Sequence, residues 1–209
     1  MNKENFEVLA YFYNENDFKF RRYLEIHRKG TNQIENDLNV IMMNPGSSKP
    51  KDIDEQKSND FLDKFVVAHP DPTQYQIMKV MDNCNFNFAK IINLSDIRNS
   101  SSNSFYEMIK KNELKEINHS IFNDANDNYL TNYLNPKSTF ILGWGVNKIL
   151  NNLSKLALHK IEKIFGKELR LSSLKHPNNS YGYYHPLPRN EKQQVDWVNK
   201  ITAQIKNYS

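Results

Sequence analysis

The sequence predicts an α/β fold: a three-layer α/β/α sandwich with a mostly parallel central sheet of about four strands, plus an N-terminal hairpin. Two observations support this class. Short continuous apolar runs, typical of strands buried on both faces, recur as LNVIMM, FAKIINL and STFILGW. Segments with helical spacing alternate with these runs, which favours parallel strands joined by helices. We expect residues 1–209 to form a single domain.

Residues 1–35 are expected to form an antiparallel extension of this domain. FEVLAYFY at 6–13 and FKFRRYLEIHR at 18–28 read as extended segments. The turn-forming sequence NENDF lies between them, which predicts a hairpin or an antiparallel edge.

The first half of the sheet follows. LNVIMM at 38–43 predicts the first buried strand, and FAKIINL at 88–94 predicts the second. A helix is expected over 71–84, because Asp71 and Pro72 are residue types that open helices. The stretch from Lys49 to Asp60 is polar and irregular.

The second half repeats the pattern of strands and helices. The expected elements are a helical segment opened by serines over 100–130, a third strand at 138–144, an amphipathic helix over 146–165 ended by Gly166, a fourth strand at 168–174 and a closing helix over 191–208.

Composition restricts the function classes. The net charge of +4 and the sequence pI of about 8.9 suit a polyanionic partner without requiring one. Cys84 is the single cysteine, which excludes internal disulfides and cysteine-rich metal centres and fits a reducing cytoplasm. No signal-like region and no run of about 18 apolar residues occurs, so we expect a cytoplasmic protein that does not contact the membrane.

Polar residues follow each predicted strand, where ligands bind in such sheets. Asn44-Pro45-Gly46-Ser47 follows the first strand, Asn93 ends the second, Trp144 ends the third, and two His-Pro pairs, at His176 and His185, follow the fourth. Each feature also has a structural interpretation: a turn, a helix cap, close helix–strand packing, or a loop. Their succession at four strand ends favours a binding site.

Taken in order, these residues resemble motifs of the uracil-DNA glycosylase superfamily. MMNPG is similar to its first motif, KIINLSDIR to the strand ending in a base-reading asparagine, FILGWGVNKIL to a strand ending in Trp-Gly, and HPLPRN to its His-Pro motif. Over residues 38–190 the chain resembles still more closely an uncharacterised bacterial and phage family of mobile elements, the domain of unknown function 1643, which is assigned to the same superfamily. That family's pattern also includes Asp71-Pro72-Thr73.

The resemblance implies a role for each motif residue. Asn44 would position a water molecule, Pro45, Gly46 and Ser47 would bring backbone amides to the base, and Asn93 would read its edge. His185 would donate a hydrogen bond to the base oxygen, and Trp144 would help to bind the base. Further contacts with nucleic acid are assigned to Leu187, Arg189 and Lys49.

The chain departs from the most active branch of the superfamily at the water site. That branch has an aspartate followed by tyrosine and histidine, whereas Asn44 is followed here by Ser47 and Ser48 after the turn. An amide cannot take a proton, so slower catalysis is expected. Asp71 has two interpretations, a helix cap or a replacement base.

Two assignments stay open, and a metal site is not expected. The stacking ring is not identified, and Phe61, Phe65 and Tyr75 are the candidates. His176 is the alternative to His185. A metal site from His69, Asp71 and His185 matches no known ligand spacing, so we expect no metal and no cofactor.

Three hypotheses follow. The first is a glycosylase-like enzyme that hydrolyses the N-glycosidic bond of an altered base in nucleic acid, DNA rather than RNA. The second is a non-catalytic protein of a phage or mobile element that binds nucleic acid, a free nucleobase or a nucleotide. The third is a protein-interaction module with an exposed aromatic face at Tyr181, Tyr183 and Tyr184. The oligomeric state is left open.

Overall fold

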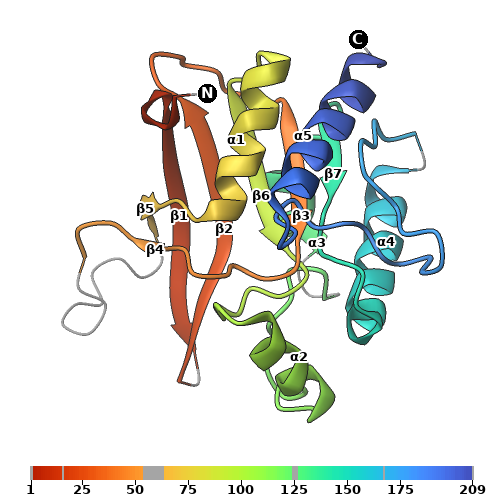
Figure 1. Ribbon diagram of the computed structural model, residues 1–209. Coiled ribbons are helices and arrows are strands. Elements are labelled where there is room, and N and C mark those ends of the chain that lie inside the picture. The colour runs from red at the N-terminus through yellow and green to blue at the C-terminus, as the bar shows by residue number, and fades with distance from the viewer. Residues whose placement is uncertain (1, 16, 54–63, 124–126, 167, 209) are drawn as a thin grey trace.

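The protein folds around a seven-stranded mixed sheet with the strand order β4-β5-β1-β2-β6-β3-β7 (Figure 1). The computed structural model describes residues 2–15, 17–53, 64–123, 127–166 and 168–208. Its strands are β1 Phe6–Glu15, β2 Phe18–Arg28, β3 Leu38–Met42, β4 Lys49–Pro50, β5 Lys64–His69, β6 Phe88–Asn93 and β7 Thr139–Leu142.

The predicted sheet of about four mostly parallel strands is wrong, although the α/β class holds. Only the β6-β3-β7 pairings are parallel, and the other four pairings are antiparallel. The hairpin of β1 and β2 was expected as an extension, but β2 pairs with β6, for example Leu24 with Ile91. This pairing satisfies the backbone groups that β6 would otherwise expose as an edge strand.

The expected fourth strand at 168–174 is not a strand. The segment makes one parallel bridge, between Phe140 and Leu171. The next backbone donor, the N–H of Leu142, donates its hydrogen bond to the Oγ of Ser173 at 2.7 Å. A side-chain oxygen therefore takes the place of the next backbone acceptor, and the ladder stops.

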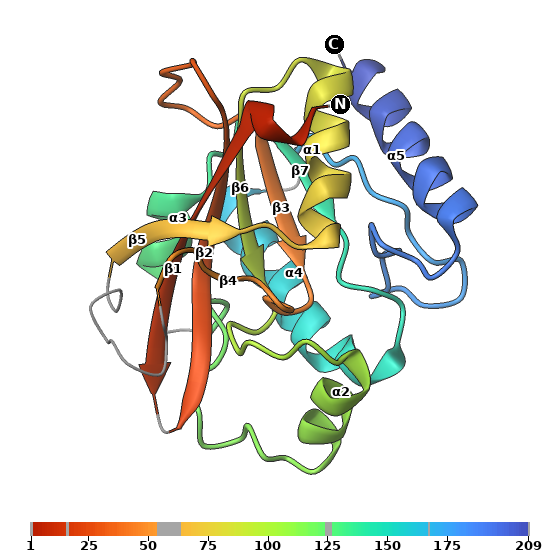
Figure 2. The ribbon, with the colours of Figure 1, turned by 60° about the vertical axis from the view of Figure 1, so that its left-hand side comes forward.

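The helices lie on both faces of the sheet (Figures 1 and 2). Those described are α1 Pro72–Cys84, α2 Ser102–Lys110, α3 Asp127–Tyr133, α4 Asn151–Phe165 and α5 Glu191–Lys206. Two views show α1 and α5 on one face and α3 and α4 on the other, with α2 beyond the carboxyl ends of β3 and β6. The predicted helices at 71–84, 146–165 and 191–208 are confirmed in substance, whereas the helical segment at 100–130 is interrupted between α2 and α3.

Two apolar clusters fill the two sides. The cluster under α1 and α5 includes Phe12, Leu24 and Met42, and the cluster on the other face includes Phe20 and Trp144. Short 3-10 turns occur at Lys3–Asn5 and Lys148–Leu150. No helix in the described ranges has the length and apolar character needed to cross a membrane.

The hairpin contains a β-bulge that decides where two arginines point. Tyr11 pairs with Tyr23, but the next residue, Phe12, pairs with Arg21, so Arg22 is the extra residue. Paired residues share a face of the sheet. Arg21 therefore shares the α1 and α5 face with Phe12, while Arg22 reaches Asp96 and Tyr13.

Candidate functional site

A cleft of about 530 Å³ opens at the carboxyl ends of β3 and β6, beside the N-terminus of α1. The loop before α5 and the start of α2 complete its walls. Ten residues singled out from the sequence line it: Asn44, Pro45, Gly46, Ser47, Asp71, Asn93, Trp144, His185, Leu187 and Arg189. Strand ends that are far apart in the sequence thus meet here, as the parallel part of the sheet requires.

Other candidates lie elsewhere. Lys49 is exposed on β4 and pairs with His69, outside the residues that line the cleft. His176 lies near Tyr184, with ring centroids 5.5 Å apart, and its Nδ1 accepts a hydrogen bond from the Asn178 N–H. It does not line the cleft, so the geometry favours His185 of the two histidines.

The two described candidates for the stacking ring do not line the cleft. Phe65 packs against Tyr11 and Tyr23 on the hairpin sheet, and Tyr75 lies on α1 beneath Lys3. Phe61 lies outside the described residues. The ring from α2 that lines the cleft is Tyr106, which the sequence did not single out.

Asn93 is the most informative residue of the cleft. It is the last residue of β6, is completely buried, and pairs in register with Met42 of β3. Neither its Oδ1 nor its Nδ2 has a hydrogen-bond partner among the described residues. A buried amide is normally satisfied, so an open donor and an open acceptor point to a ligand that supplies both.

His185 presents a fixed donor to the same cleft. Its Nδ1 accepts a hydrogen bond from the Leu187 N–H at 3.1 Å, which assigns the ring proton to Nε2. Burial lowers the pKa of His185, and the carboxylate of Asp71 opposes this shift. The ring is therefore neutral at pH 7 and can donate through Nε2.

The side-chain nitrogen of Asn44 is hydrogen-bonded to other described residues, and its oxygen is not. Its Nδ2 donates to the carbonyl of Asn99 at 2.7 Å and to that of Ile97 at 3.4 Å, which ties β3 to the loop after β6. Its Oδ1 has no hydrogen bond within the described part of the chain and can accept one from water.

Gly46 is required by its conformation and its neighbour. Its φ of +65° is a left-handed value that favours glycine. A Cβ at this position would lie 3.2 Å from Oδ2 of Asp71. The turn after Asn44 and Pro45 therefore brings the backbone against a carboxylate.

Asp71 combines its two predicted interpretations. Its Oδ1 accepts from the N–H groups of Thr73 at 2.9 Å and Gln74 at 3.0 Å, and Gln74 returns a bond in a capping box. The helix-cap prediction is thus confirmed. Its Oδ2, on the side of Gly46, places a carboxylate in the cleft as well.

Trp144 is not positioned as a free recognition group. The indole is 1% exposed, its Nε1–H donates to the Tyr181 carbonyl at 2.7 Å, and Tyr183 packs edge-on against it. Its N–H is therefore used within the protein. Tyr183 is also buried, so the exposed aromatic face expected at Tyr181, Tyr183 and Tyr184 reduces to the exposed Tyr184 and the partly exposed Tyr181.

Gly143 allows the loop that carries His185 to approach. A Cβ on Gly143 would lie 3.1 Å from Cδ of Pro186. The glycine before Trp144 therefore lets the His-Pro segment pack against the end of β7.

Arg21 lines the cleft and was missed from the sequence. It is 2% exposed, and its Nε and Nη1 have no hydrogen-bond partner among the residues the structure describes. Burial lowers the pKa of Arg21 to about 10, and Asp71 partly offsets the shift. Strand alternation from Leu24 and Ile26 predicts that Arg22, and not Arg21, lies on the face covered by α1 and α5. The bulge shifts the alternation by one residue and places Arg21 on that face instead.

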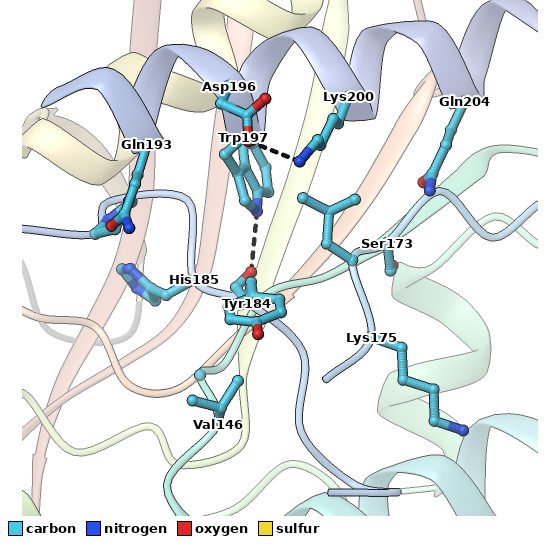
Figure 3. Close-up of a pocket in the computed structure, with 13 residues that line it drawn as sticks. Val146, Ser173, Lys175, Tyr184, His185, Gln193, Asp196, Trp197, Lys200 and Gln204 are labelled. Atoms are coloured by element: carbon cyan, nitrogen blue, oxygen red, sulfur yellow. Dashed lines mark hydrogen bonds and ion pairs between the residues drawn. The ribbon is translucent and has the colours of Figure 1, made fainter. Parts of the chain in front are cut away.

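A second cavity of about 760 Å³ adjoins the cleft between α5 and the segments at 173–175 and 184–188 (Figure 3). His185 stands at its margin, where the two spaces share Gly145 and Pro188. Figure 3 shows Trp197 donating from Nε1 to the Tyr184 carbonyl, at 3.0 Å, and an ion pair between Asp196 and Lys200. Gln204 Oε1 is a buried atom of this lining without a partner among the described residues, whereas the smaller cleft has unpaired atoms on both Asn93 and Arg21 and is the better candidate site.

Comparison with known proteins identifies a family. A family described as "Protein of unknown function (DUF1643)" matches residues 22–187, a range that begins directly after Arg21 and ends before α5. No curated protein and no solved structure matches the chain.

Proposed function

The chain belongs to the DUF1643 family of proteins of unknown function, and we propose that its cleft binds a pyrimidine base extruded from nucleic acid and hydrolyses the N-glycosidic bond of an altered base. The proposal also includes kinship with the uracil-DNA glycosylase superfamily, a phage or mobile-element origin and a cytoplasmic setting. The strand-end motifs support the kinship with that superfamily.

The observation that carries the proposal is the open amide of Asn93. A uracil-type edge offers a ring N–H beside a carbonyl oxygen, which complements an amide that both donates and accepts. Leaving two buried polar groups without partners costs about 1–3 kcal/mol each, and a bound base would remove that cost.

The remaining cleft residues suit bond cleavage. When the bond between the base and C1′ breaks, its electron pair leaves with the base, and negative charge grows on the base oxygens. The neutral Nε2–H of His185 can stabilise that charge. Water then adds to C1′, with Asn44 Oδ1 orienting it and the Asp71 carboxylate accepting its proton.

The nucleic acid would lie across the mouth of the cleft. Arg189 is exposed and Leu187 is partly exposed at this mouth, and the net charge of +4 favours a polyanion. DNA is the polymer we propose first.

The second candidate function is binding of nucleic acid or a nucleotide without cleavage. It is favoured by one observation: an amide, Asn44, stands at the water site, and its Nδ2 is already used to hold the loop at 97–99. Such a site reads a base but activates water weakly.

The test is base release from labelled single-stranded and duplex DNA containing uracil or an oxidised pyrimidine. We expect release by the wild type, a loss of about 100-fold or more in Asn44→Ala and His185→Ala, and unchanged release in His176→Ala, the matched histidine outside the cleft. Absence of release from every substrate, with binding that weakens as salt rises, would support the binding function instead.

A further inference from the structure

We propose that Arg21 forms an oxyanion subsite at the inner end of the cleft, so that the preferred ligand is a pyrimidine carrying a carboxylate or phosphate group near its amide edge. The identity of the pyrimidine rests on the proposed function. The oxyanion subsite rests on Arg21 and its surroundings alone.

The first step is that two guanidinium donors of Arg21 lack hydrogen-bond partners among the described residues. Arg21 is almost completely buried, and its Nε and Nη1 donors have no partner in the described part of the chain. Burying a guanidinium without an acceptor is strongly unfavourable, so such groups are normally paired. An arginine presents planar donors that match the oxygens of a carboxylate or a phosphate.

The second step is that neither neighbouring carboxylate pairs with Arg21. Oδ2 of Asp96 accepts from Nε of Arg22 at 3.1 Å and from the Tyr13 hydroxyl at 3.2 Å, and its Oδ1 has no partner among the described residues. Asp71 uses Oδ1 for the cap of α1, and neither carboxylate makes a hydrogen bond to Arg21. No described residue thus supplies a hydrogen-bond acceptor to Nε and Nη1 of Arg21, and a ligand in the cleft that Arg21 lines can supply one.

The third step is that Arg21 and Asn93 line the same cleft. The backbone N–H of Arg21 donates to the Asp96 carbonyl at 2.9 Å, which fixes β2 next to the segment that follows β6. Arg21 and Asn93 are both buried and line the same cleft, whereas Arg189 is exposed. An oxyanion at Arg21 thus belongs to the part of the ligand that enters the cleft.

Two sources can supply this oxyanion, a carboxyl group on the base or the phosphate of a small nucleotide. Calorimetric titration should compare uracil, 5-carboxyuracil, 6-carboxyuracil, the neutral 5-hydroxymethyluracil and uridine monophosphate. We expect one oxyanion ligand to bind the wild type at least about 10-fold more tightly than uracil and 5-hydroxymethyluracil. Preference for a carboxyuracil identifies the base, and preference for the monophosphate identifies the phosphate.

Arg21→Gln should abolish this preference, while Arg170→Gln, which removes an exposed arginine outside the cleft, should keep it. Equal affinity of the wild type for all five compounds would overturn the inference, and so would a preference that persists in Arg21→Gln. If uracil binds without an oxyanion preference, the proposed function survives and the inference fails.

Inorganic phosphate provides a second measurement that does not depend on a base or on the folding of Arg21→Gln. At constant ionic strength, phosphate should raise the melting temperature of the wild type more than chloride does. Arg21→Lys should lose most of this difference, because a lysine lacks the planar donors. If phosphate stabilises the protein only when Arg21 is present and no pyrimidine binds, the oxyanion subsite is supported and the pyrimidine ligand is rejected. Equal effects of phosphate in both proteins would overturn the subsite.

Discussion

Asn39 and Asn93 are both fully buried, on the neighbouring strands β3 and β6, but only one is satisfied by the protein. Asn39 Oδ1 accepts from Asn36 Nδ2 at 2.8 Å, and its Nδ2 donates to the Asn135 carbonyl at 2.7 Å. The amide of Asn93 has no such partners among the described residues. The contrast separates an asparagine that stabilises the fold from one that is available to a ligand.

Replacing each asparagine with leucine should therefore change stability in opposite directions. Asn93→Leu removes an unsatisfied amide and should raise the unfolding free energy by about 1 kcal/mol, while Asn39→Leu breaks two buried bonds and should lower it by about 1–3 kcal/mol. Thermal melts without ligand measure both, with shifts of about 2–4 °C per kcal/mol. Equal destabilisation by the two variants would show that Asn93 has a structural role.

His185 gives a prediction about protonation. Burial lowers its pKa, and the Leu187 N–H occupies Nδ1, so the ring should stay neutral with its proton on Nε2 when the pH falls to the ordinary histidine value of about 6.5. Nitrogen NMR of the imidazole should show a midpoint below that value. Protonation of Nδ1 would break the bond to Leu187, so binding of the base should weaken only in this acidic range. A midpoint at or above 6.5, or a proton on Nδ1 at neutral pH, would contradict the assignment.

At the scale of elements, helix α1 and the turn after β3 share Asp71. Asp71→Ala removes the cap and should destabilise the protein by about 1 kcal/mol, whereas Asp71→Asn keeps an oxygen acceptor and should change stability by less than about half of that. Both variants should lose base release, because neither retains the carboxylate beside Gly46. Urea unfolding and the oligonucleotide assay separate the effects, and full release by Asp71→Asn would remove Asp71 from the mechanism.

The sequence was informative about elements where one local signal dominates. Continuous apolar runs predicted β3, β6 and β7, and the Asp71-Pro72 cap predicted α1. The segment at 168–174 failed because Ser173 replaces a backbone acceptor, a detail of pairing that its apolar pattern does not contain. The strand β5 was missed because its register with β1 is set by partners about 55 residues away in the chain.

The candidate site shows the same division. Asn44 and Asn93 could be placed together because strand ends meet at one edge of a parallel sheet. His185 also lines the cleft, although the segment expected as the strand before it is not a strand. The place of Arg21 in the cleft could not be predicted, since the face of the sheet on which it lies depends on the bulge. The partner of the Trp144 N–H could not be predicted either, because the carbonyl that accepts it belongs to Tyr181, in a loop with no pattern that predicts it.

At the scale of the whole molecule, Asp96 joins the hairpin to the parallel strands. It is buried and contacts Arg22 and Tyr13, both from the hairpin, while it follows β6 in the sequence. Burial raises the pKa of Asp96 to about 6, and the bonds from Arg22 and Tyr13 oppose this shift without cancelling it.

This carboxyl should give the stability of the protein a distinct pH dependence. The folded state holds the proton more tightly than the unfolded chain, whose pKa is about 3.9, so the contribution of Asp96 is greatest below that pH and is lost as the pH rises through about 6. Urea unfolding from pH 4 to pH 7 should show the wild type losing stability relative to Asp96→Asn as the pH rises. A difference that grows in favour of the wild type with pH would mean that the ion pair with Arg22 outweighs burial.

The hairpin supplies a single residue, Arg21, to the described lining of the cleft, and the rest comes from the parallel strands and the segments around them. β1 and β2 pair with each other along their length, so the register that points Arg21 into the cleft is set within the hairpin, while β1 also pairs with β5 and β2 with β6. Selectivity for a charged substituent and recognition of the base edge would then evolve separately. A chimaera that replaces residues 6–28 with the hairpin of a relative would change which ligand is preferred while it keeps the amide of Asn93 and the donor of His185.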